Sequence, residues 1–111
     1  MKQNILYKIY MGHRCVYIGS ITGDLTATLR MHFFGKENIL DIERVSKIEY
    51  ISLPSFADCL VYKTYLINVN KPIYNKLDKA RDELSNNIAL PDLNFIEYNN
   101  PIIEKWKEML K

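Results

Sequence analysis

A lysine in an apolar stretch and a group of basic residues near the N-terminus are the side chains best suited to binding chemistry. Lys63 interrupts the apolar stretch 56–69, so its ammonium group should reach the surface, where it could bind a phosphate or an acidic partner. Several basic side chains could gather on one side of a hairpin and contact nucleic acid. They are Lys2, Lys8, His13 and Arg14. Basic residues are equally common on a strand surface that only faces solvent. Nucleic-acid binding and a plain solvent-exposed surface therefore both stay open.

The two cysteines predict free thiols rather than a disulfide. The chain has 111 residues, 48% of them hydrophobic and 25% charged. A folded domain of this size hides roughly 65% of the surface that its unfolded chain exposes, so a core can form without cross-links. Cys15 and Cys59 each lie beside apolar residues and are expected to behave as small hydrophobic side chains.

Charge and hydropathy exclude some classes of protein. The formal net charge of +2 neither indicates nor excludes nucleic acid as a partner. No apolar stretch approaches the roughly 18–20 residues of a membrane span, and the apolar run after Met1–Asn4 is too short for a secretory signal. We therefore expect a cytoplasmic protein with no membrane partner.

The first elements that must position these side chains are a hairpin and a helix. Ile5–Tyr10 and Cys15–Ile18 are β-favouring runs joined by a short link that contains Gly12, which predicts a β-hairpin. In the segment 24–34, apolar residues recur at four-residue steps, which predicts a helix that ends at Gly35.

A strand and a long helix follow. Residues 47–53 alternate polar with apolar side chains until Pro54, which predicts a strand with one buried face. Ser55 is a suitable N-cap for an apolar helix over 56–69, which Pro72 closes.

The C-terminal part is predicted to supply two helices. Residues 76–88 carry apolar side chains at helical spacing, 91–100 look irregular or extended, and 101–111 form a last helix. Its apolar side either caps the core or provides a surface for a protein partner. That side consists of Ile102, Ile103, Trp106 and Leu110.

Several short motifs between residues 5 and 75 resemble the GIY-YIG nuclease family. The second half of the family's name is intact as Tyr17-Ile18-Gly19, whereas in the first half Ile5 and Leu6 replace glycine and isoleucine, and Tyr7 keeps the tyrosine. Further matches are Asp24-Leu25, His32-Phe33 and Lys71-Pro72-Ile73-Tyr74-Asn75. The resemblance implies an α+β fold with a small three-stranded antiparallel sheet flanked by helices. We expect one domain over 1–111, with this core at 5–75 and a helical extension at 76–111 packed on it.

The resemblance also implies where the catalytic residues of such a nuclease would lie. The family hydrolyses phosphodiesters with tyrosines, an arginine and a divalent metal held by one glutamate. The arginine position falls on Thr28, or on Ala27 in a second register, and Arg30 lies about 200° around the helix from Thr28. The glutamate position falls on Lys63, whose charge beside a divalent ion costs roughly 8 kcal/mol at 4 Å and an effective dielectric constant near 20. We therefore expect no metal site of the family's kind.

These substitutions predict a degenerate GIY-YIG-like domain that has no nuclease activity. It would bind nucleic acid or a protein through the former active-site face. Free-standing members of this family often come from phages or other mobile elements, so the resemblance implies such a source. The residues expected there are Tyr7, Arg14, Tyr17, Thr28, His32, Lys63 and Asn75.

Two alternatives stay open. The first is a divergent Mg²⁺-dependent endonuclease that uses the tyrosines, His32 and Arg30 with a relocated carboxylate such as Glu37 or Glu49. The second is a protein-interaction factor that acts through its C-terminal helix.

Overall fold

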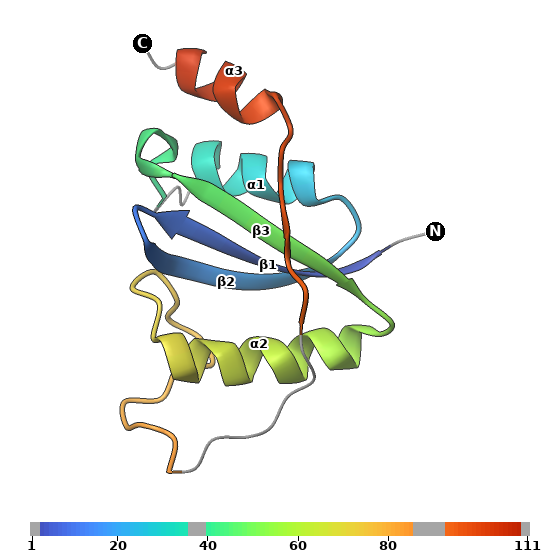
Figure 1. The fold of residues 1–111 in the computed structure, drawn as a ribbon, viewed down its shortest axis with the longest axis vertical. Helices are drawn as coiled ribbons and strands as arrows, with labels where there is room; N and C mark the ends of the chain where they lie inside the picture. The colour runs from blue at the N-terminus through green and yellow to red at the C-terminus, as the bar shows by residue number, and fades with distance from the viewer. Residues whose placement is uncertain (1–2, 36–39, 86–92, 110–111) are drawn as a thin grey trace.

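The computed structural model has a four-stranded antiparallel sheet with helices on both faces (Figure 1). It describes residues 3–35, 40–85 and 93–109. The strands are β1 (Asn4–Met11), β2 (Arg14–Thr22), β3 (Lys47–Leu53) and β4 (Ile96–Glu97), in the order β2-β1-β3-β4. The α+β class, the hairpin and the strand 47–53 are thus confirmed. The expected three strands become four, because two residues of the segment expected to be irregular or extended pair with β3.

Side chains cap the N-termini of the two long helices, and the cap of the second is the Ser55 predicted from the sequence. Helix α1 (Leu25–Phe34) has Asp24 as its N-cap, whose side chain accepts a hydrogen bond from the Thr26 N–H. Helix α2 (Phe56–Asn70) has Ser55 as its N-cap, whose hydroxyl accepts from the Asp58 N–H at 3.0 Å. A 3₁₀ turn, η1 (Ile42–Arg44), precedes β3. These caps satisfy backbone donors that the first helical turn leaves without partners.

Alternation along the strands creates two cores, one on each face of the sheet. Because successive side chains of a strand point to opposite faces, Tyr7 and Ile9 of β1 pack on the α1 side, and Leu6 packs on the α2 side. Figure 1 shows α1 and α2 on opposite sides of the sheet. The core beneath α2 includes Leu6, Ile18, Cys59 and Ile67. None of the described helices is both long enough and apolar enough to span a bilayer.

The predicted helix over 76–88 is wrong for the residues that the structure describes. Residues 76–85 form turns and bends, and 86–88 lie outside the described residues. Asp78 has a φ of 62°, in the left-handed region that interrupts an α-helix. The Asp78 carbonyl accepts a hydrogen bond from the Asn68 side-chain amide at 2.8 Å, and the Ala80 and Asp82 carbonyls accept from Lys71 Nζ at 2.7 Å each. Side chains of α2 and its C-cap therefore bind the carbonyls that a helix would have used itself.

The last helix, α3 (Ile102–Met109), buries its tryptophan, and Leu110 lies outside the described residues. Trp106 is only 6% exposed, and its ring packs edge-to-face with Phe33 and Phe34 of α1 at centroid distances of 6.2 and 5.8 Å. Trp106 therefore caps the core, which is one of the two roles that the sequence left open for this side of the helix. Its side chain attaches α3 to α1, with Ile102 and Ile103 packed against the same core.

Candidate functional site

Two tyrosines and a histidine meet on the α1 side of the hairpin. Tyr7 Oη and His32 Nε2 are 2.6 Å apart, and the Tyr17 ring lies edge-on to His32 with centroids 4.8 Å apart. The Tyr7 and Tyr17 rings are 6.1 Å apart. From the sequence, all three are expected at one site. In the structure they come from β1, β2 and the last turn of α1. We call Tyr7, Tyr17 and His32 the Tyr–His cluster.

Gly19 makes room for the cluster. It lies directly opposite Tyr7 in the β1–β2 register, and a Cβ atom there would come within 2.5 Å of the Tyr7 Cζ and Oη atoms. Carbon atoms do not approach so closely without displacement, so the tyrosine ring requires a residue without a side chain. The glycine of the Tyr-Ile-Gly motif is therefore needed for packing.

Burial keeps the cluster uncharged near neutral pH. Desolvation raises the pKa of Tyr7 far above its ordinary value, with the neighbouring Tyr17 as a second cause, and burial also raises the pKa of Tyr17. Burial lowers the pKa of His32 below 6.5. A protonated Tyr7 hydroxyl and a neutral imidazole fit a hydrogen bond from Tyr7 Oη to His32 Nε2. The cluster is therefore poorly suited to supply a tyrosinate as a general base.

Of the helix residues considered for the arginine role, Thr28 lies one turn before His32 on the same face of α1, whereas Ala27 and Arg30 face away from the cluster. The Thr28 hydroxyl donates to the Asp24 carbonyl of its own helix at 3.2 Å. Arg30 is exposed and lines a groove together with Phe34 and Trp106, on the side of α1 that faces α3. The structure thus brings Tyr7, Tyr17 and His32 together, and it places Arg30 elsewhere.

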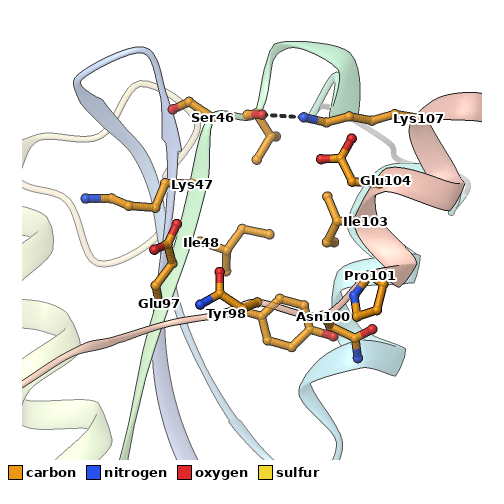
Figure 2. Close-up of a pocket in the computed structure, with 12 residues that line it drawn as sticks. Ser46, Lys47, Ile48, Glu97, Tyr98, Asn100, Pro101, Ile103, Glu104 and Lys107 are labelled. Carbon is orange, nitrogen blue, oxygen red and sulfur yellow. Dashed lines mark hydrogen bonds between the residues drawn. The ribbon is translucent and has the colours of Figure 1, made fainter.

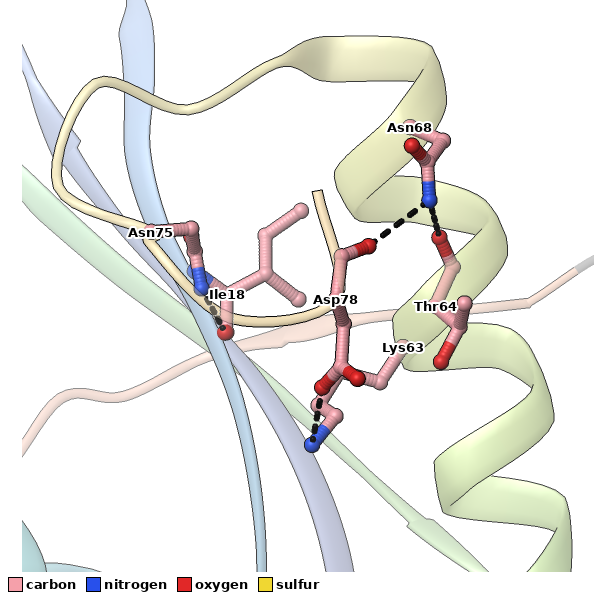
Figure 3. Close-up of polar contacts among 6 residues, drawn as sticks. All are labelled: Ile18, Lys63, Thr64, Asn68, Asn75 and Asp78. Atoms are coloured by element: carbon pink, nitrogen blue, oxygen red, sulfur yellow. Dashed lines mark hydrogen bonds and ion pairs between the residues drawn. The ribbon is translucent and has the colours of Figure 1, made fainter. Parts of the chain in front are cut away.

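Lys63 is held in an ion pair on the other side of the sheet. Its ammonium group lies 3.3 Å from the Asp78 carboxylate, and its side chain is 19% exposed (Figure 3). Sequence reasoning missed this partner because Asp78 was expected on a helix of its own. Lys63 is therefore already paired, which lowers the attraction it could offer to a phosphate.

Asn75 completes the edge of the sheet. Its side-chain oxygen accepts from the Ile18 N–H at 2.8 Å, and its side-chain amide donates to the Ile18 carbonyl at 2.9 Å (Figure 3 draws the second). The Tyr74 N–H donates to the Val16 carbonyl at 2.9 Å. The segment 74–75 thus covers β2, an edge strand whose backbone groups would otherwise lack partners. Asn75 acts here as a structural residue, because both ends of its amide are engaged.

The carboxylates considered for a relocated metal site do not join the cluster. Glu49 faces Lys8 in the β1–β3 register, so it lies on the sheet face opposite Tyr7, and it is 3.8 Å from Lys47. Glu37 lies outside the described residues. Across 3–35, 40–85 and 93–109, no group of three or more His, Cys, Asp or Glu side chains could hold a metal ion.

Tertiary contacts gather basic side chains at one end of the sheet. The Ser46 hydroxyl donates to the Gly12 carbonyl at 2.8 Å and the Ser46 N–H donates to the Tyr10 carbonyl at 2.9 Å, which brings the start of β3 to the hairpin turn. The exposed basic residues there are His13, Arg14, Arg44 and Lys47. We call these four residues the hairpin end.

The hairpin end differs from the basic group expected from the sequence. Lys8 lies 4.1 Å from the centre of the Phe95 ring, on the face covered by α2, and Lys2 lies outside the described residues. Arg44 and Lys47 are distant from the hairpin in sequence and were not foreseen.

A pocket of about 340 Å³ lies beside the hairpin end, between β3 and α3 (Figure 2). Lys47 lines it, and Lys107 lies across from it with its ammonium group donating to the Val45 carbonyl at 2.9 Å. Glu97 and Glu104 also line the pocket, so its charge is mixed.

Comparisons of the chain with known proteins found no matching family model, no matching curated protein and no matching solved structure.

Proposed function

We propose that this chain is a non-catalytic GIY-YIG-like domain that binds nucleic acid through the hairpin end and the adjoining Tyr–His cluster. The observation that carries the proposal is the convergence of exposed His13, Arg14 and Arg44 at one end of the sheet, joined by Lys47 in a loose 3.8 Å contact with Glu49. Guanidinium and ammonium groups bind phosphate oxygens by charge-assisted hydrogen bonds, and their grouping on one surface suits a phosphate backbone.

The Tyr–His cluster lies next to these cations. Tyr17 is three residues beyond Arg14 on β2, a separation of about 10 Å along a strand. Tyr17 and His32 are half-buried, whereas Tyr7 is almost fully buried. A partly accessible aromatic pair beside a basic surface can contact a base or a sugar of a bound strand.

The absence of cleavage follows from the same contacts. The position that would hold the metal-binding glutamate is Lys63, which is paired with Asp78. The position that would hold the arginine is Thr28, whose hydroxyl bonds to its own helix. With neither a metal ligand nor a phosphate-binding guanidinium beside Tyr7, the developing charge of phosphodiester hydrolysis has no stabilising group.

The test is fluorescence anisotropy with labelled duplex DNA, single-stranded DNA and single-stranded RNA over a range of NaCl concentrations. Three bound phosphates predict that log K falls with log[NaCl] with a slope of roughly −2 to −3. The double variant Arg14→Glu/Arg44→Glu should weaken binding at least tenfold and flatten the salt dependence. The control Arg81→Glu makes the same arginine-to-glutamate change, with half the change in net charge, at an exposed residue of the 76–85 segment and should bind like the wild type.

Cleavage is assayed in parallel on supercoiled, branched and single-stranded DNA and on RNA with Mg²⁺ or Mn²⁺. We expect no metal-dependent products. Products that disappear in Tyr17→Phe would replace the proposal with the divergent endonuclease. Equal affinity of the double variant and the Arg81→Glu control would reject the hairpin end as the binding surface.

A further inference from the structure

Helices α1 and α3 form an apolar groove on the outside of the molecule. The groove measures about 960 Å³, and its apolar wall comes from one residue per turn of each helix. On α1 the wall is Ala27, Met31 and Phe34, and on α3 it is Ile102, Trp106 and Met109. Two helices with apolar side chains at this spacing leave a channel into which a third helix can pack.

The methionines of this groove are unusually exposed for their type. Met31 is 72% exposed and Met109 is 74% exposed, whereas Trp106 forms the floor at 6%. Methionine side chains are flexible and adapt to the shape of a partner, and they are frequent on surfaces that bind apolar helices. The floor is rigid, because Trp106 packs on Phe33 and Phe34.

The charges beside the groove are two basic side chains and one carboxylate that is engaged as a helix cap. Arg30 lines it on α1, and Lys105 is exposed three residues after Ile102, which places it on the same side of α3. Asp24 also lines the groove, but its carboxylate accepts the Thr26 N–H at 3.0 Å as the N-cap of α1. Among the described residues the ion pairs are Lys47–Glu49 and Lys63–Asp78, and neither involves Arg30 or Lys105.

We propose that this groove binds an acidic amphipathic helix of a partner protein. Apolar residues of that helix, spaced one per turn, fill the channel over Trp106, and its carboxylates pair with Arg30 and Lys105. This surface is distinct from the hairpin end, so this proposal can be tested separately from nucleic-acid binding.

A second copy of the chain fits the groove less well. The apolar side that α2 exposes would be the natural helix to offer, with Leu60 and Val61 as its contacts. The one carboxylate of α2 is Asp58, which is half-buried in the first turn, so this helix offers at most one partner to Arg30 and Lys105. An acidic helix satisfies both the apolar channel and the charges on its walls.

Trp106 provides the readout, because it is the only tryptophan in the chain. The probe is a synthetic tryptophan-free peptide of about four helical turns, with leucine at one position per turn and glutamate on both flanks of that stripe. A matched peptide carries lysine in place of every glutamate. Each peptide is titrated into the intact protein while the emission of Trp106 and the anisotropy of a label on the peptide are followed.

We expect the acidic peptide to shift the Trp106 emission and to bind at least tenfold more tightly than the basic peptide. Arg30→Glu should weaken the acidic peptide at least fivefold and strengthen the basic one. Met31→Glu should weaken the acidic peptide by a similar factor. The control Leu77→Glu makes the same kind of change at an exposed apolar residue of the 76–85 segment and should leave the affinity unchanged.

Three results would overturn the proposal. The first is no binding, or equal affinity for the two peptides. The second is displacement of the acidic peptide by nucleic acid, which would assign the groove to the nucleic-acid surface. The third is a dimer in sedimentation experiments that Met31→Glu converts to monomer, which would assign the groove to a second copy. Circular dichroism and thermal unfolding of each variant verify that a lost affinity does not reflect a lost fold.

Discussion

Replacing Asn75 by alanine should destabilise the protein far more than an ordinary loop substitution. The Asn75 side chain is only 8% exposed, and its amide makes hydrogen bonds of 2.8 and 2.9 Å with the N–H and carbonyl of Ile18. Asn75→Ala leaves the N–H and the carbonyl of Ile18, on the edge strand β2, without partners. Each unsatisfied buried group costs about 1–3 kcal/mol, so for the two groups we expect a loss of about 2–6 kcal/mol in the free energy of unfolding.

Urea unfolding and thermal melts would measure this loss. For a domain of roughly 100 residues, 1 kcal/mol shifts Tm by about 4 °C, so the expected change corresponds to a fall in Tm of about 8–24 °C. Asn70→Ala is the matched control, because the Asn70 amide makes one exposed hydrogen bond to the Leu66 carbonyl at 2.9 Å. That control should lose less than about 0.5 kcal/mol.

The variant Asn75→Asp separates the two hydrogen bonds. A carboxylate can still accept from the Ile18 N–H, but its second oxygen faces the Ile18 carbonyl without a proton to share. Burial against the Ile18 carbonyl raises the pKa of this carboxyl in the folded protein above its ordinary value near 4, and protonation restores a donor, so the destabilisation by Asn75→Asp should shrink as pH falls toward about 4 and stay constant below it. If Asn75→Ala were as stable as Asn70→Ala, the view of Asn75 as the residue that closes the edge of β2 would be refuted.

Three further outcomes follow from the site. Gly19→Ala should cost about 1–3 kcal/mol in urea unfolding, because its Cβ meets the Tyr7 ring at 2.5 Å, and part of this loss should be recovered when Tyr7→Leu is added. Burial lowers the pKa of His32, so the unfolded chain binds more protons between that lowered value and about 6.5; stability should rise with pH through this window, and His32→Gln, compared by urea midpoints at pH 5 and 7.5, should flatten the rise. Lys63→Met should lower the unfolding free energy by less than about 1 kcal/mol, because the Asp78 carboxylate is 45% exposed; a larger loss, or one unchanged by added salt in urea titrations, would contradict the view of a weak, solvent-screened ion pair.

Much of the fold was readable from local patterns. The hairpin, β3, α1, α2 and α3 correspond to segments with a two- or four-residue period and with capping residues or prolines at their ends. These signals depend only on residues that are close in the sequence, so they can be recognised without knowing the tertiary contacts. The alternation of β1 likewise assigns Tyr7 and Leu6 to opposite faces without any knowledge of the partner helices.

Distant contacts decided the rest. The segment after Asn75 has the apolar spacing of a helix, yet Asn68 and Lys71 bind its carbonyls and prevent one. The same docking supplies Asp78 to Lys63. Local periodicity reports which face of a segment is apolar, but it carries no information on which distant donor will reach its backbone.

The candidate site likewise has a part that the sequence indicated and a part that only the tertiary structure decided. The motifs that resemble the GIY-YIG family led us to expect Tyr7, Tyr17 and His32 at one site, and these motifs lie on segments whose local patterns predicted the two strands and the helix. Only the tertiary structure decided that Trp106 is buried, that Asn75 completes β2, and that Arg44 joins Arg14 at the hairpin end. Each of these depends on a hydrogen bond or packing contact between residues far apart in the chain, and such contacts form only when the whole sheet and its helices assemble.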